Sequence, residues 1–150
     1  MNHYRPLFIM LVLSFVAMYA LMFAMADSTT NIYNSLNQFY MAALMASPMA
    51  LLEIAVMSAM YKDKRLNAII AAASVFVLVA SFAFIRQQTA IGDKQFLRSM
   101  IPHHASAILM CEQASITDAK IRELCRGIIS GQQAAIDQMK GILRELDASR

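Results

Sequence analysis

Three long apolar runs in the first 86 residues constrain the fold of this chain more than any other feature. Residues 7–26 and 66–85 carry no charge, and residues 39–61 carry one, on Glu53. A helix that crosses a bilayer needs about 20 apolar residues, and in lipid the backbone must satisfy its own hydrogen bonds, which favours helix for such segments. We therefore predict an all-α chain in which residues 1–86 form a membrane domain of three transmembrane helices.

The composition supports a chain that lives in the lipid bilayer. Hydrophobic residues make up 59% and charged residues 15%, against roughly 45–50% and about 25% in soluble proteins. Glycine and proline are scarce, with four and three copies, which favours long helices. The net charge of +3 is too small and too scattered to indicate a nucleic-acid partner.

The cations near the apolar runs predict an orientation. Arg5 precedes the first run, and Lys62, Lys64 and Arg65 lie between the second and third, whereas residues 27–38 contain no Lys or Arg. Because short cytoplasmic loops carry the excess of Lys and Arg, we expect a bacterial inner (plasma) membrane protein with a cytoplasmic N-terminus. The C-terminal domain is then periplasmic or extracellular.

The first run also admits a second interpretation. The sequence Ala-Met-Ala at residues 24–26, before Asp27, resembles a signal-peptidase site. The run is longer than the apolar part of a usual signal peptide, so we favour a retained anchor over cleavage of residues 1–26. Both interpretations leave the C-terminal segment outside the cytoplasm.

Residues 92–147 have the pattern of an antiparallel helical hairpin. Gly92 and Asp93 begin the first helix, and Thr117 or Asp118 caps the second. At about 100° per residue, each helix presents one face of apolar and ligand-type side chains. These are Phe96, Met100, His103, His104, Ala107, Met110 and Cys111 in the first helix, and Ile121, Leu124, Cys125, Ile128, Gln132, Ile136, Met139 and Leu143 in the second.

Folding these two helices back on each other predicts specific neighbours. Cys111 should face Cys125, His104 should face Gln132, and Met100 should lie near Ile136 and Met139. A single hairpin cannot bury two apolar stripes well. We therefore expect a homodimer in which two hairpins complete a four-helix bundle.

The hairpin sequence resembles a known family. The segments FLRSMIPHHASAILM and LCRGIISGQQAAIDQM are similar to the family called domain of unknown function 305, through a pattern that covers about residues 92–146. The resemblance implies a ferritin-like helical bundle outside the cytoplasm, in a family whose studied members bind copper or silver ions. Ala135 replaces a glutamate of the family pattern. The matching residues are Phe96, Met100, Pro102, His103, His104, Ala107 and Met110, and then Gln132, Ile136 and Met139.

The chemistry of these residues favours a soft metal ion. Thioethers select Cu(I), and imidazole serves copper and zinc alike. We expect a copper ion, Cu(I) in preference, at Met100, His104 and Met110, with His103 and Met139 as additional ligands. The alternative is that each methionine only packs in the core and that each histidine is a hydrogen-bonded core residue.

The two cysteines, Cys111 and Cys125, leave three possibilities open. A disulfide suits an oxidising compartment, reduced thiolates could join a Cu(I) site, and both residues could be small members of the core.

The second apolar run carries its own pattern of thioethers. Methionines and one carboxyl recur every four residues and could form a membrane path for Cu(I), since ionisable residues inside a membrane are functional candidates. The alternative is that the spans only anchor and dimerise the chain. The stripe consists of Met41, Met45, Met49, Glu53 and Met57.

These observations predict a membrane-anchored protein that captures soft metal ions outside the cytoplasm for resistance, storage or hand-off. No nucleophile–base pair or paired carboxylate indicates catalysis, so we expect a protein that is not an enzyme. The alternatives are a copper transport component that uses the stripe of residues 41–57, and a structural or signalling membrane subunit without metal.

Overall fold

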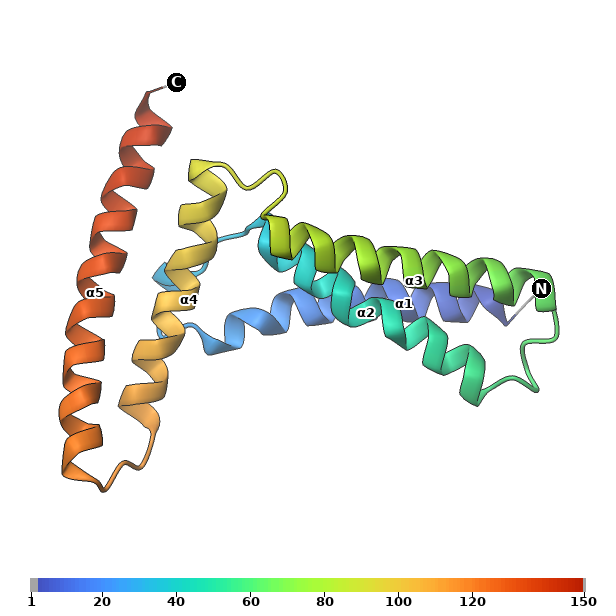
Figure 1. The fold of residues 1–150 in the computed structure, drawn as a ribbon, viewed down its shortest axis with the longest axis horizontal. Coiled ribbons are helices and arrows are strands. Elements are labelled where there is room, and N and C mark those ends of the chain that lie inside the picture. The colour runs from blue at the N-terminus through green and yellow to red at the C-terminus, as the bar shows by residue number, and fades with distance from the viewer. Residues whose placement is uncertain (1–2, 150) are drawn as a thin grey trace. The chain divides into compact units, whose positions relative to one another are not determined.

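The computed structural model describes residues 3–149 and contains five α-helices, two short 3-10 helices and, within this range, no strand (Figure 1). The all-α prediction is confirmed. The chain divides into two compact units. The first comprises the chain up to Met22 together with Asn37–Ala90, and the second comprises Phe23–Leu36 and the chain from Ile91 onward.

The first unit contains the three apolar helices. α1 spans Tyr4–Leu21, α2 spans Leu36–Val56 and α3 spans Lys64–Gln87. All three are long and apolar enough to cross a membrane, the first together with the 3-10 helix η1 at Met22–Met25. α2 ends at Val56 rather than at the predicted Tyr61, because the chain turns toward α3 after Val56. Asp63 caps α3: its side chain accepts hydrogen bonds from the backbone N–H groups of Arg65 and Leu66.

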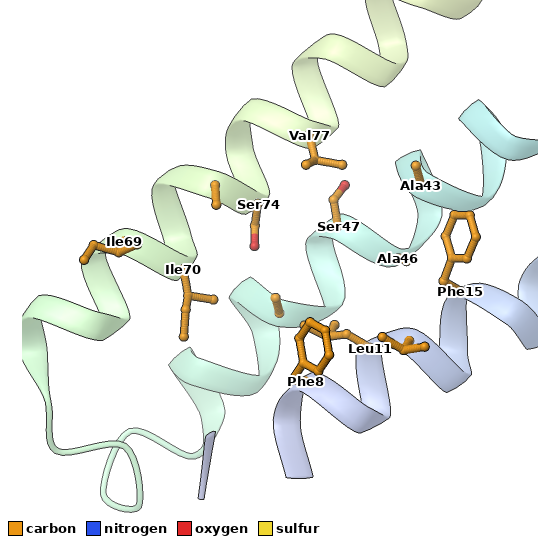
Figure 2. Close-up of a pocket in the computed structure, with 13 residues that line it drawn as sticks. Phe8, Leu11, Phe15, Ala43, Ala46, Ser47, Ile69, Ile70, Ser74 and Val77 are labelled. Atoms are coloured by element: carbon orange, nitrogen blue, oxygen red, sulfur yellow. The ribbon is translucent and has the colours of Figure 1, made fainter. Parts of the chain in front are cut away.

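Small side chains occupy most of the buried positions of this unit. Ala42, Ala46 and Ala50 recur every four residues on α2, and Ser74 and Ser81 are buried on α3, as expected where helices associate in lipid. The packing leaves an open apolar groove of about 480 Å³ between the three helices (Figure 2). Residues that line it include Phe8, Leu11 and Phe15 on α1, Ala43, Ala46 and Ser47 on α2, and Ile70, Ser74 and Val77 on α3.

The second unit is built on α4 (Asp93–Gln113) and α5 (Ala119–Ala148), which run antiparallel side by side (Figure 1). Asp118 caps α5 by accepting from the backbone N–H groups of Lys120 and Ile121 at 2.8 and 3.1 Å, so the predicted second helix start is confirmed.

The segment Phe23–Leu36 belongs to this second unit, whereas the sequence placed it within a membrane domain of residues 1–86. Tyr33, which follows the 3-10 helix η2 at Thr29–Asn31, packs against the core of α4 and α5. The backbone N–H of Leu36 donates to Gln95 Oε1 at 3.0 Å. These contacts join two segments far apart in the sequence, which helical periodicity does not predict.

The core of the second unit corrects the predicted inner face of α4. The buried aliphatic side chains of α4 each follow a residue of the predicted stripe by one position, so the buried face is rotated by about 100° around the helix axis. Phe96 and Met110, which belong to the predicted stripe, are 49% and 60% exposed. The prediction followed the metal-ligand types, whereas the longest aliphatic side chains of α4 determine which face packs on α5. The buried residues are Leu97, Ile101, Ala105 and Ile108 on α4, with Ile136 and Leu143 on α5.

Candidate functional site

His104 and Gln132 form the centre of the candidate site. Both side chains are half-buried between α4 and α5, and they interact as predicted. Apart from this mutual interaction, His104 Nδ1 and Gln132 Oε1 are buried without a further hydrogen-bond partner among the described residues. No other described protein group therefore competes with a ligand for this pair.

The surroundings of His104 favour the neutral form of its ring by lowering its pKa. Burial lowers the pKa of His104, the neighbouring His103 lowers it further, and the side chain of Gln132 acts in the opposite direction. Neutral imidazole is the form that binds metal ions. The environment therefore suits a ligand role for this ring.

The other predicted ligands divide into two groups. Met100 is half-buried one helical turn before His104, and residues four apart on a helix are neighbours. Met139 is partly buried and packs against the core. His103 and Met110 are exposed instead, and the ring centroids of His103 and His104 lie 6.4 Å apart. Helical spacing thus puts Met100 beside His104, and the structure leaves His103 and Met110 exposed on α4.

The structure joins Cys111 and Cys125 in a disulfide across the turn, with Cα atoms 5.4 Å apart. This is the first of the three possibilities that the sequence left open. In this state the two sulfurs cannot serve as thiolate ligands. Within residues 3–149 no three His, Cys, Asp or Glu side chains gather as a metal-ligand group.

One side of the α4–α5 pair presents apolar side chains to the surroundings. Placed on a helical projection, a set of mostly apolar outward residues from both helices falls on one side, which we call the open face. Thr30 and Tyr33 line a pocket with Asp137 and Arg144 on the other side of α5. The open face comprises Phe96, Met100, His103, Ala107 and Met110 on α4, and Ile121, Leu124, Ile128, Ala135 and Ile142 on α5, none of them with a fixed charge.

The methionine stripe of α2 is not a continuous interior path in one chain. Met41, Met45 and Met57 are 38%, 44% and 40% exposed, and Met49 is half-buried. Glu53 Oε1 accepts a hydrogen bond from the Tyr61 hydroxyl at 3.3 Å. The stripe therefore divides into exposed methionines and one hydrogen-bonded carboxyl.

Sequence reasoning missed part of the surroundings of Glu53. Glu53 and Met57 line a pocket that also includes His3 and Met10 from the beginning of the chain. Helical spacing within α2 carries no information about which residues of α1 lie beside it, so no local pattern could have identified these two.

Comparison with known proteins identifies related sequences. A protein-family profile described as "Domain of unknown function (DUF305)" matches residues 36–143. The match therefore includes α2 and α3 as well as α4 and most of α5, and is wider than the resemblance over about residues 92–146. The chain is also similar to "Uncharacterized protein L153" of Acanthamoeba polyphaga mimivirus, with 36% identity over 140 residues that cover 91% of this chain and 90% of the relative. No solved structure matches the chain significantly.

Proposed function

Because the chain belongs to the family described as domain of unknown function (DUF305), we propose that it is a membrane-anchored, non-catalytic protein whose α4–α5 pair binds a soft metal ion. The ion is Cu(I) or Ag(I), held for storage, resistance or hand-off. The observation that carries the proposal is the buried Nδ1 of His104, which has no partner other than Gln132 among the described residues, with the Met100 thioether one helical turn away. A bound cation would take a lone pair of the neutral ring.

His104 and Met100 are the ligands that one chain supplies. Nδ1 of the neutral His104 ring offers a lone pair, and Met100 offers a thioether one turn away. Thioether with imidazole is a donor set that favours copper. Gln132 would orient the ring or a bound water, since outer partners of a metal-binding histidine fix its tautomer and direction.

The donor set argues for a soft ion over a harder one. Calcium, magnesium and manganese prefer carboxylate and carbonyl oxygens. His104, Met100 and Gln132 supply nitrogen, sulfur and one amide oxygen, and no Asp or Glu is among the proposed ligands. A thioether also stays a ligand without losing a proton, so binding through Met100 needs no deprotonation.

A second copy of the chain would complete both the fold and the site. The open face is about 30 Å long, from the 21 residues of α4 at 1.5 Å each, and about 20 Å wide across two helices. Two such faces would bury roughly 1,200 Å², the lower limit for a stable specific interface. Pairing would bring the outward His103 and Met110 of one copy toward those of the other.

The proposed orientation places the α4–α5 pair outside the cytoplasm, with the N-terminus and the loop of residues 62–65 inside. Lys62, Lys64 and Arg65 support it through the excess of positive charge in cytoplasmic loops. The disulfide between Cys111 and Cys125 supports the same arrangement, since such bonds persist in oxidising compartments.

Replacing the two ligands tests metal binding. In the full-length protein in detergent, Met100→Leu or His104→Ala should weaken one equivalent of Cu(I) binding by at least about 100-fold, because even the loss of an outer-shell partner costs about 10–100-fold. Competition with a chromogenic Cu(I) chelator measures this effect. The matched control is Met41→Leu, which removes an exposed thioether in α2 and should change nothing.

The same titration distinguishes the alternatives. A wild-type protein that binds no Cu(I) and remains folded would contradict the proposal and favour a structural or signalling subunit. Equal Cu(I) affinity in wild-type and His104→Ala proteins would contradict the assigned site.

A further inference from the structure

A second pocket with soft donors lies in the first unit, whereas His104 belongs to the second. It measures about 280 Å³ and lies where the beginning of α1 meets the end of α2 and the turn after it. We call it the Glu53 pocket. Its chemically active lining residues are His3, Met10, Glu53, Met57, Met60 and Tyr61.

The carboxyl of this pocket is held in place by a hydrogen-bonded network. The Tyr61 hydroxyl donates to Glu53 Oε1 at 3.3 Å, and Tyr61 is only 3% exposed. Asn67 Nδ2 donates to the Tyr61 backbone oxygen at 2.8 Å, and the Tyr4 hydroxyl donates to Asn67 Oδ1 at 2.8 Å. Residues from α1, α3 and the intervening turn thus position the carboxyl beside the methionines.

A carboxyl within an apolar helix is costly and usually has a function. Glu53 is the single charged residue in the apolar run of residues 39–61. Anchoring in lipid does not require it, and a leucine at this position would be better suited to the bilayer. Its place in a pocket that also contains three thioethers and one imidazole points to a ligand rather than to packing.

We infer that the Glu53 pocket binds a monovalent soft cation, Cu(I) or Ag(I), through Met10, Met57 and Met60, with Glu53 as the counter-charge. Three thioethers favour a soft ion. One ionised carboxyl with one monovalent cation gives a neutral pair, which is the charge state that a low-dielectric environment penalises least. His3, exposed at the edge of the pocket, is placed to receive or release the ion.

This site is independent of the one proposed at His104. It uses different residues in the other compact unit. Of the methionine stripe of α2, Glu53 and Met57 line this pocket, whereas Met41 and Met45 do not.

Silver titration of the full-length protein in chloride-free detergent solution tests the inference. The background variant combines Met100→Leu, His103→Ala, His104→Ala, Met110→Leu and Met139→Leu, which removes the candidate donors of α4 and α5. It should still bind one Ag(I), measured by equilibrium dialysis and elemental analysis. Adding Met10→Leu, Met57→Leu and Met60→Leu, which are near-isosteric changes, should weaken that Ag(I) by at least about 100-fold.

Two further variants make the result specific. Glu53→Gln should weaken Ag(I) binding in the same background, while its amide oxygen can still accept from Tyr61. Met41→Leu with Met45→Leu, at exposed positions on the same helix, should leave Ag(I) binding unchanged.

The outcomes separate this inference from the proposed function. If the wild-type protein binds Ag(I) but the background variant binds none, the Glu53 pocket is not a site while the His104 site stands. If the background variant binds one Ag(I) that the three leucine substitutions do not affect, the pocket assignment is wrong. If circular dichroism shows that the leucine variant has less helix than the background variant, the Glu53→Gln variant replaces it as the test. Unchanged Ag(I) affinity in Glu53→Gln would then contradict the pocket assignment.

Discussion

Placing a charge on the open face by Leu124→Glu should raise the dissociation constant of the dimer by at least about 100-fold. Leu124 is 61% exposed in the single chain and lies on the side that we propose a second copy covers. In a two-fold symmetric dimer each copy would bury one unpaired carboxylate, and an uncompensated buried charge costs about 3–5 kcal/mol. Analytical ultracentrifugation of the full-length protein in detergent measures the dissociation constant.

The control for this prediction is Ser130→Glu. It adds the same charge to the exposed side of α5 that faces away from the open face, where the Ser130 hydroxyl donates only to the Gly127 carbonyl. The control should dimerise like the wild-type protein. A monomeric wild-type protein, or a Leu124→Glu variant that dimerises normally, would show that the open face is not the dimer interface.

Removing the disulfide should destabilise the α4–α5 pair by about 3 kcal/mol. Cys111 and Cys125 are separated by 14 positions, and cross-linking a loop of about 15 residues restricts the unfolded chain by about this amount. The variant Cys111→Ser, Cys125→Ser should therefore show faster amide hydrogen exchange throughout α4 and α5. Mass spectrometry of the exchanged peptides measures the change in the free energy of opening.

The control replaces one small residue of the same turn, Ala114→Ser, which is exposed and leaves the disulfide intact. Its exchange should match that of the wild-type protein. Unchanged exchange in the double-serine variant would mean that the aliphatic core alone holds α4 and α5 together.

The three spans could be predicted because lipid leaves few structural choices. An uncharged run of about 20 residues already determines a helix, so the structure changed only the ends, as at Val56. The start of α5 could also be predicted from the sequence, since Asp118 has a side chain that can cap a helix. The packing of Tyr33 on α4 and α5 could not be predicted, because a contact between distant segments leaves no periodic pattern in either segment.

The candidate site was predicted in part for a similar reason. Opposed positions in an antiparallel pair follow from the turn, which is why the pairing of Cys111 with Cys125 and of His104 with Gln132 was correct. The predicted buried face of α4 was wrong because its sequence contains two adjacent apolar stripes. The spacing of residues cannot decide which of the two stripes packs on α5. The aliphatic Leu97 and Ile101 do so, leaving His103 outward.

The proposed site requires that imidazole and thioether share one metal ion at the α4–α5 pair. The most direct test is the copper K-edge absorption spectrum of the full-length protein loaded with one equivalent of Cu(I), with Met10, Met57 and Met60 replaced by leucine to remove the Glu53 pocket. The account predicts sulfur and imidazole scattering together in the first shell of copper, with the imidazole contribution reduced in His104→Ala. A first shell of oxygen and nitrogen alone, unchanged by His104→Ala, would contradict it.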